Sequence, residues 1–502
     1  MSALAEELPS RQSDPPDVIM RKRLVTAGCM LAIFMAAVEA TIVATAMPTI
    51  VADLGGAHLF SWVFSAYLLT QAVTTPLYGR LADIYGRKLV FIAGSSLFLV
   101  SSAACGFTWN MASLVIFRVI QGLGAGSVQS VATTIVGDIY SPTERARMQG
   151  WLSGVWVLAA VIGPSLGAAT VQYLNWAYVF WVNLPVGAIA MALIGVFLAE
   201  EPQPRRHDID YLGAILLMLG LGAIMTVLVQ AQSLGWTLAA SLGATGVAAI
   251  AWLTAHERRT KEPIIPIALL RNRTIAAGTF GSLIVGALLM CVVAFLPTYV
   301  QAVMGRSAAV AGSVLTGLSL AWSCGSMSAG RLMVRTSARL SGTVGALALI
   351  AGATMLITLE FGGGLLWMTA GCLLVGIGMG FCHIVFLLVV QASVGWSERG
   401  IATASTLFAR TLGQAIGAGL GGAILNYGIA SRAPDTGDVL GRLIEPGLRQ
   451  ALGADQIARL VEAVATSLHD IYVVGGVLAL VALATALLLP AGAGRAPSPK
   501  AN

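Results

Sequence analysis

The sequence predicts an all-α membrane protein with fourteen transmembrane helices, built as two pseudo-symmetric six-helix bundles with two extra helices between them. Of its 502 residues, 57% are hydrophobic and only 10% are charged, whereas a soluble domain carries about 25% charged residues. The deficit of charge extends along the whole chain, which excludes a soluble domain with a single membrane anchor. Apolar runs of about 20 residues, long enough to cross a bilayer as helices, follow one another throughout.

The apolar runs give the order of the expected spans. The first begins at Leu24 and lacks a convincing cleavage site, so we interpret it as a retained span rather than a signal peptide. The spans are expected at 24–46, 60–79, 89–107, 112–136, 149–170, 177–198, 211–231, 237–255, 275–299, 308–329, 342–359, 366–393, 401–425 and 469–489.

Positive charge is distributed unevenly between the segments that connect these runs. With the N-terminus inside, most of the 29 lysines and arginines fall in inner segments, and the outer ones hold Arg306, Arg432, Arg442, Arg449 and Arg459. This bias follows the positive-inside rule, and it predicts a multi-pass protein of the cell (inner) membrane with both termini cytoplasmic. The same bias explains the net charge of +6 without a nucleic-acid partner.

Two polar segments suggest how the chain is divided. The inner segment 199–210 contains prolines and follows the sixth span, so we interpret it as a bundle boundary. The outer segment 427–468 has apolar residues at helical spacing, which predicts one or two amphipathic helices that pack on the bundle or contact a partner. The predicted parts are an N-terminal tail 1–23, a bundle 24–198, a linker with two extra spans 199–273, a second bundle 274–489 that includes the segment 427–468, and a C-terminal tail 490–502.

A short internal repeat supports two related halves. GRLADIYGRK at 79–88 follows the second span, and GRLMVRTSAR at 330–339 follows the tenth. Two six-span halves with two extra spans between them would place the copies in this way. Such halves are typical of transporters that hold their substrate near the midplane of the bilayer.

Glu39 and Arg118 lie inside apolar runs at matching depths. A charge at bilayer depth costs at least about 2.5–3.5 kcal/mol. Glu39, within AAVEATIVATAMP, lies about 22 Å from the inner edge, counted from Leu24 at about 1.5 Å per residue. Arg118 in the fourth span lies about 21 Å from the same edge of a core about 30 Å thick. We therefore expect these two charges to pair.

The segment GRLADIYGRK connects the second and third spans. Its glycines allow tight turning, and an ordinary positive-inside loop would explain only Arg87 and Lys88. The segment resembles the loop signature of the major facilitator superfamily at nearly every position. We expect Asp138, at the end of the fourth span, to join Asp83 and Arg87 in an inner-face network that closes when the cavity faces outward. The resulting gating motif consists of Gly79, Arg80, Asp83, Gly86, Arg87, Lys88 and Asp138.

Other segments resemble one branch of this superfamily, the fourteen-span drug/proton antiporters. FRVIQGLGAG in the fourth span and NWAYVFWVNLPVG at 175–187 are similar to motifs of that family, as is EATIVATAMP in the first span. The family commonly has Asp at the position of Glu39. The fifth span, GVWVLAAVIGPSLG, resembles the antiporter signature through Gly154, Gly163, Pro164 and Gly167, and the proline is expected to loosen the helix.

The resemblance implies a proton-driven exporter of hydrophobic or amphipathic compounds that works by alternating access. Glu39 is then the proton carrier and Arg118 a coupling residue, because a carboxyl group that alternates between two environments can take up and release a proton. The alternative for this pair is a static ion pair that fastens two spans. The alternative for the whole protein is a dedicated exporter of one metabolite or lipid-like molecule on the same fold.

Polar and aromatic residues within the spans are candidates for the wall of a substrate cavity. Each has an alternative role in helix packing or in hydrogen bonds between helices. The candidates are Gln121, Gln129, Trp156, Trp322, His383, Gln391, Arg410 and Gln414.

Several functional classes find no support in the sequence. No cluster of His, Cys and acidic residues has the spacing of an enzyme site or a metal site, and we expect no cofactor. There is no phosphate-binding loop for ATP, and the repeat argues against a channel or receptor. The six cysteines fall within apolar runs, so we expect no structural disulfide. The expected unit is a monomer in the lipid bilayer, with a periplasmic adaptor as a further partner if the organism is Gram-negative.

Overall fold

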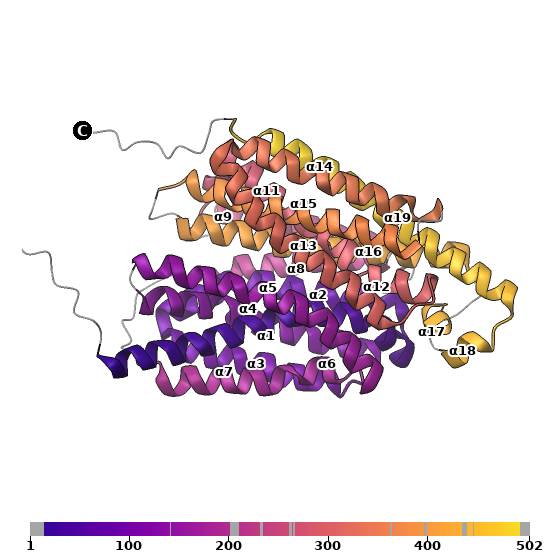
Figure 1. Ribbon diagram of the computed structural model, residues 1–502, viewed down its shortest axis with the longest axis horizontal. Coiled ribbons are helices and arrows are strands. Elements are labelled where there is room, and N and C mark those ends of the chain that lie inside the picture. The colour runs from indigo at the N-terminus through magenta and orange to yellow at the C-terminus, as the bar shows by residue number, and fades with distance from the viewer. Residues whose placement is uncertain are drawn as a thin grey trace, which may run out of the picture.

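A computed structural model of the protein describes residues 15–140, 142–200, 210–230, 234–260, 264, 267–361, 364–395, 399–433, 439–444 and 446–491. Every regular element in these ranges is a helix. Figure 1 shows the long helices running side by side in one elongated bundle. The apolar helices identify a multi-pass membrane protein.

The N-terminal half of the bundle contains five long helices and a sixth in two pieces. These are α1 (Pro16–Leu54), α2 (Phe60–Tyr85), α3 (Arg87–Gly106), α4 (Met111–Ile139), α5 (Pro142–Tyr173), and α6 (Tyr178–Trp181) with α7 (Asn183–Phe197). α1 packs against α4, α5 and α7, and α4 packs against α2 and α3. α1 and α4 therefore connect the two groups of helices in this half.

The C-terminal half is also made of long helices joined by short ones. Its elements are α11 (Arg273–Val293), α12 (Leu296–Thr298), the π-helix Tyr299–Val303, α13 (Ala308–Arg335), α14 (Ala338–Ile357), α15 (Gly364–Ala392), α16 (Arg399–Arg432), α17 (Val439–Ile444), α18 (Pro446–Gln450) and α19 (Ala454–Leu487). The segment 427–468, expected to form one or two separate amphipathic helices, is shared between the end of α16, the short helices α17 and α18, and the start of α19. α16 continues to Arg432 and α19 begins at Ala454, so the last span and its amphipathic extension form one helix.

Twelve helices of the described residues are long and apolar enough to cross a membrane, fewer than the fourteen expected spans. The other two expected spans, 60–79 and 401–425, correspond to α2 and α16, which fall outside this set. α2 and α16 pack against each other, and α16 also packs against α11. Helices surrounded by protein can carry small and polar residues that a lipid-facing helix could not.

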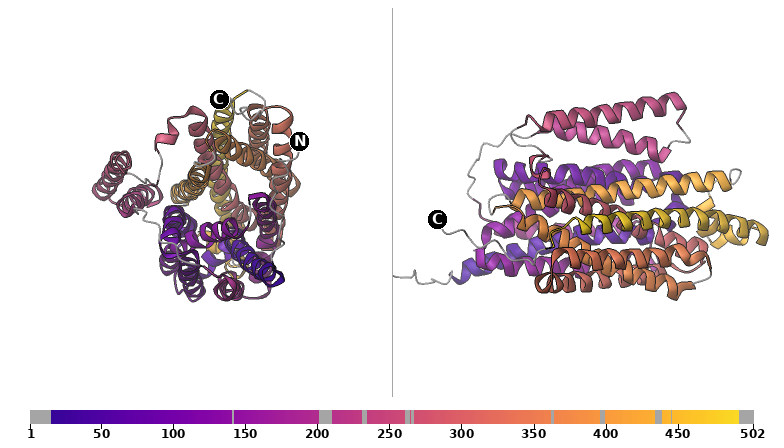
Figure 2. Two further views of the ribbon diagram at one scale, coloured as in Figure 1. Left: turned by 90° about the vertical axis from the view of Figure 1, so that its left-hand side faces the viewer. Right: turned by 90° about the horizontal axis from the view of Figure 1, so that it is seen from above.

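The extra helices α8 (Tyr211–Gln230) and α9 (Trp236–Glu257) form a hairpin beside the main bundle. Figure 2 shows this hairpin set apart from the two halves. α8 contacts both α2 and α16, whereas α9 packs chiefly on α8. The short helix α10 (Ile267–Leu270) follows the hairpin and precedes α11.

The bundle has two distinct ends. We call the end that carries Gly79–Lys88 the signature end and the opposite end, where α17 and α18 lie, the far end (Figure 1). Two hydrogen bonds between described residues of the two halves lie toward the far end. Thr316 of α13 donates to the Val161 carbonyl of α5 at 3.4 Å, and the Asn426 side chain of α16 donates to the His58 carbonyl at 2.8 Å.

Glycines set the distance between α11 and α16. A Cβ added at Gly413 would overlap the carbonyl oxygen of Leu283, and one added at Gly286 would overlap that of Arg410. Backbone therefore meets backbone at this crossing, as small residues allow between helices in a membrane.

Candidate functional site

Glu39 of α1 and Arg118 of α4 are in direct contact. The Arg118 Nη1 donates to Glu39 Oε1, and the exposed fractions of Glu39 and Arg118 are only 1% and 2%. The two side chains that were expected to pair because of their similar depths are therefore in contact in the structure. An ion pair this deeply buried has high desolvation costs, which the attraction between the charges offsets only when further hydrogen bonds satisfy the remaining polar atoms.

Neutral polar side chains supply those hydrogen bonds. Asn183 Nδ2 donates to Glu39 Oε2 at 2.6 Å, and Arg118 Nη1 also donates to Gln121 Oε1 at 2.7 Å. Ser102 Oγ accepts from Asn183 Nδ2 at 3.1 Å and from Gln121 Nε2 at 3.2 Å. The result is one continuous network that links α1, α3, α4 and α7.

The guanidinium group of Arg118 has two additional contacts with α2. Its Nε donates to the Val63 carbonyl at 2.9 Å, and its Cζ lies 4.0 Å from the centre of the Tyr67 ring. A cation over an aromatic face is stabilised by the ring quadrupole. Arg118 thus contacts α1, α2 and its own helix at once, which makes its position sensitive to any change at Glu39.

Three partners in this network were not among the predicted site residues. Asn183, Ser102 and Tyr67 are uncharged, and within apolar runs they give a weaker signal than a charge does. Asn183 lies in the segment NWAYVFWVNLPVG, which was singled out as a motif, and Ser102 lies within the third span. A search for amides and hydroxyls at the depth of Glu39 would have identified both.

A second polar cluster lies at the signature end. Arg87 Nη2 donates to Asp83 Oδ1 at 2.9 Å, and Arg87 Nε donates to Asp138 Oδ2 at 2.8 Å. The predicted network of these three residues is therefore present, and it joins the ends of α2, α3 and α4. All three helices belong to the N-terminal half, so the bonds hold that half together at this end.

Glu200, just beyond α7, completes this cluster and was not predicted. Its carboxylate accepts from the backbone N–H groups of Arg87 at 2.6 Å and Lys88 at 2.9 Å, which caps the N-terminus of α3. The Lys88 Nζ donates to the Leu198 carbonyl at 3.2 Å. Gly86 has a φ of 91°, and a Cβ there would lie 3.0 Å from Glu200 Oε2. The glycine of the signature is thus required by its backbone angle and by this cap.

The predicted antiporter motif lies where α5 passes between α1 and α13. A Cβ added at Gly163 would overlap Thr41 Oγ1, and one at Gly167 would lie 2.7 Å from the Ile42 carbonyl oxygen. The carbonyl oxygen of Pro164 lies 2.8 Å from a Cβ built on Gly312 of α13. Gly154 faces open space. The motif therefore allows close approach both within the N-terminal half and across to the other half.

The remaining predicted cavity residues do not form one cluster. Trp322 of α13 and His383 of α15 form an edge-to-face pair with ring centres 6.1 Å apart, and Arg410 is close enough to act electrostatically on His383. Gln391 donates instead to Thr403 Oγ1 at 3.0 Å and joins α15 to α16. Half-buried side chains of this set outside these pairs are Gln129, Trp156 and Gln414.

Comparison with known proteins identifies the family. The sequence model of the Major Facilitator Superfamily matches residues 29–418. The chain belongs to this superfamily. The match confirms the resemblance found in the sequence motifs.

Relatives within the superfamily include named multidrug proteins. The multidrug transporter protein MdtP of Bacillus subtilis (strain 168) is 33% identical over 81% of this chain and 76% of its own length. Multidrug resistance protein 3 of the same strain is 34% identical over 80% of this chain and 79% of its own. The acurin A biosynthesis cluster transporter of Aspergillus aculeatus is 32% identical over 88% and 82%.

Solved structures share the superfamily fold at low identity. A bacterial homolog of the human lysosomal transporter Spinster, in an inward-facing unoccupied conformation, matches with a TM-score of 0.66 at 18% identity, covering 94% of this chain and 97% of that one. A D-xylose-proton symporter matches with a TM-score of 0.62 at 14% identity, covering 94% and 98%. Proteins of this family are transporters, and the relatives named above are transporters rather than enzymes.

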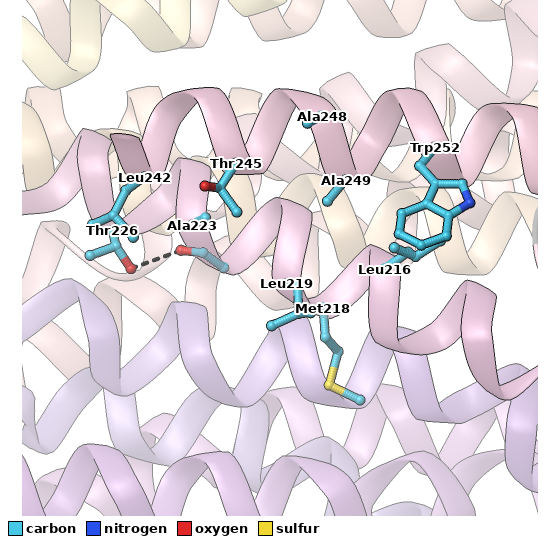
Figure 3. Close-up of a pocket in the computed structure, with 11 residues that line it drawn as sticks. Leu216, Met218, Leu219, Ala223, Thr226, Leu242, Thr245, Ala248, Ala249 and Trp252 are labelled. Atoms are coloured by element: carbon cyan, nitrogen blue, oxygen red, sulfur yellow. Dashed lines mark hydrogen bonds between the residues drawn. The ribbon is translucent and has the colours of Figure 1, made fainter. Parts of the chain in front are cut away.

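An apolar groove on this superfamily member lies away from the polar site. It has a volume of about 550 Å³ and lies between the extra helices α8 and α9. Figure 3 shows its lining, including Met218, Leu242 and Trp252, with Thr226 hydrogen-bonded along its own helix. None of the predicted site residues lines this groove.

Proposed function

We propose that this superfamily member is a secondary active transporter that exports hydrophobic or amphipathic compounds by proton antiport. The observation that carries the proposal is the buried Glu39–Arg118 pair, because an ionisable residue within a membrane bundle marks an ion or substrate pathway. The names of the multidrug relatives support the substrate class. A dedicated exporter of one compound is the alternative, since another relative belongs to a biosynthesis cluster.

The proposed architecture has fourteen crossings and two related halves. α2 and α13 each end in a copy of the repeat, and α5 and α16 are the third helices after them. The main helix contacts between the halves are α2 with α16 and α13 with α5. If each helix is replaced by its counterpart in the other half, the α2–α16 contact becomes the α13–α5 contact, which supports a pseudo-two-fold relation. The same relation supports counting α2 and α16 among the membrane crossings.

In the proposed mechanism, Glu39 carries the proton and Arg118 responds to it. Protonation of Glu39 would remove the negative charge that compensates Arg118. An uncompensated buried charge is strongly unfavourable, so the Arg118 contacts with Val63 and Tyr67 of α2 would have to readjust. Because α2 also packs against α16, this change at Glu39 would reach the contact between the halves.

Alternating access would require the bundle to open at one end at a time. Thr316 with Val161, and Asn426 with His58, join the halves by hydrogen bonds toward the far end, and the Asp83–Arg87–Asp138 cluster of the signature end lies within one half. We assign the signature end to the cytoplasm from the bias of Lys and Arg. The protein would then act as a monomer in the cell membrane with both termini inside.

Proton flux in inside-out membrane vesicles tests this function. We expect amphipathic compounds to trigger proton release from acidified vesicles that contain the protein, and no release from vesicles that lack it. A panel of lipophilic amines, acids and neutral drugs should be added one at a time. If no compound in such a panel caused release, the dedicated exporter would become the better description.

The cluster at the signature end gives a second test of this scheme. Because the cluster joins the ends of α2, α3 and α4 into the surface that would meet the C-terminal half on closure, Asp83→Asn is expected to favour the state open at that end. The expected shift is about twofold to fivefold, since a partly exposed ion pair contributes about 0.5–1 kcal/mol. Opening can be followed as the labelling rate of Trp156→Cys by an impermeant thiol reagent from the signature side, in a Cys324→Ser background. Asp455→Asn, in the first turn of α19, is the control. Equal labelling in Asp83→Asn and its parent would remove the cluster from the gating scheme.

A further inference from the structure

Arg410 is a half-buried charge well inside the C-terminal half, and no salt bridge joins it to a carboxylate among the described residues. It lies eleven residues into α16, about 16 Å from the start of that helix. Its Nε is buried and has no hydrogen-bond partner among the described residues. From 273 to 433 the sequence contains two acidic residues, Glu360 and Glu398, and both lie outside the expected spans.

The surroundings of Arg410 suit an aromatic or apolar anion. His383 lies nine residues before the end of α15, about 14 Å from that end, and Trp322 lies thirteen residues before the end of α13, about 20 Å from it. These helix ends are at the signature end, so the three side chains share similar depths. The His383 Nδ1 is also buried without a partner among the described residues, and the Trp322 ring packs edge-on against the imidazole.

The other half shows what a compensated arginine looks like in this protein. Arg118 has Glu39, Gln121 and the Val63 carbonyl as acceptors. Both oxygens of Glu39 accept from residues of its own half, Arg118 and Asn183. A charge within a membrane bundle pairs with another group or faces a water-filled cavity, and the guanidinium fork matches a carboxylate particularly well.

We propose that Arg410, His383 and Trp322 form a subsite for the acidic group of an amphipathic substrate, a monocarboxylate attached to an aromatic or apolar body. The inference rests on the proposed export function and narrows its substrate class from amphipathic compounds in general to amphipathic anions. The carboxylate would lie against the Arg410 guanidinium, within reach of His383, and the body would lie against the Trp322 ring. A cationic compound would be repelled from this position.

Equilibrium binding to the purified full-length protein in lipid nanodiscs tests the subsite. The probes are 2-naphthoate, its neutral counterpart 2-naphthamide, and the cation 2-naphthylmethylamine. Wild type is expected to bind the acid at least about tenfold more tightly than the amide, as a hydrogen bond to a charged group allows. Arg410→Gln should remove this preference and leave amide binding unchanged, and Arg410→Lys should retain part of it.

Matched variants keep the test independent of folding and of proton coupling. Arg432→Gln alters another arginine of α16, which is paired with Asp470 at 3.0 Å, and should leave the acid preference intact. Size-exclusion profiles and thermal unfolding show whether Arg410→Gln is folded, and Trp322→Ala, which should weaken acid and amide alike, is the second variant. Equal affinity of wild type for acid and amide would overturn the subsite. Because binding needs no proton gradient, this result is separable from a failure of antiport in vesicles.

Discussion

Replacing Glu39 with glutamine is expected to reduce substrate-driven proton release to the level of vesicles without the protein. Glutamine keeps the size of the side chain and its hydrogen bond with Arg118, but it cannot carry a proton at this position. Substrate binding should persist, since the change leaves the C-terminal half untouched. The measurement is proton release in inside-out vesicles, with binding to purified protein measured in parallel.

Two further variants separate proton transfer from structural loss. Glu39→Asp, the residue common in the family, should retain proton release at a reduced rate, because the carboxyl group remains but its reach is shorter. Glu39→Gln leaves Arg118 without its counter-charge, and loss of one partner of a buried pair destabilises by about 3–5 kcal/mol. The double variant Glu39→Gln/Arg118→Gln removes both charges and should recover stability without recovering proton release. Full proton-coupled transport by Glu39→Gln would show that the pair is only a static ion pair between two helices.

Replacing Gly413 with alanine is expected to destabilise the fold more than its single added methyl group suggests. The new Cβ would overlap the backbone carbonyl oxygen of Leu283, and backbone cannot turn away as a side chain can. Overpacking by one or a few methyl groups costs about 1–3 kcal/mol, and we expect the upper part of that range here. Thermal unfolding followed by tryptophan fluorescence should show a lower midpoint.

Gly400→Ala, on the same helix, is the matched control. A Cβ at Gly400 meets no atom within 4 Å, and alanine is favoured over glycine in a helix by about 1 kcal/mol. The control should therefore unfold at the same temperature as wild type or slightly higher. If the two alanine variants unfolded alike, the close crossing of α11 and α16 would not be a determinant of stability.

The sequence alone was sufficient for the order of helices and for the central ion pair. Apolar runs mark where a membrane helix lies, and each predicted span overlaps a helix, but α1 and α19 extend well beyond the predicted bounds 24–46 and 469–489. The pairing of Glu39 with Arg118 followed from helical rise and bilayer thickness, because two charges at one depth in lipid have few other partners. The spans 60–79 and 401–425 were harder to classify, since their polar and small residues face protein.

Other parts of the site depend on tertiary packing that a single sequence does not reveal. Glu200 lies in a polar segment where an acidic residue needs no explanation, yet it caps a helix whose start is more than a hundred positions earlier. Ser102 and Asn183 could each have served helix packing alone. The continuity of α19 was missed because the amphipathic residues 454–468 have a different periodic pattern from the apolar residues that follow.

The position of α8 makes the two flanks of the transporter unequal. The halves meet along two seams, one between α2 and α16 and one between α5 and α13, and α8 contacts both helices of the first. Among the described helices, the extra hairpin covers that first seam on its lipid side, while the second has no hairpin of its own (Figure 2). A compound already dissolved in the bilayer would therefore meet a shielded flank on one side and α5 with its Gly163–Pro164 segment on the other, so lateral entry from lipid would have a preferred direction.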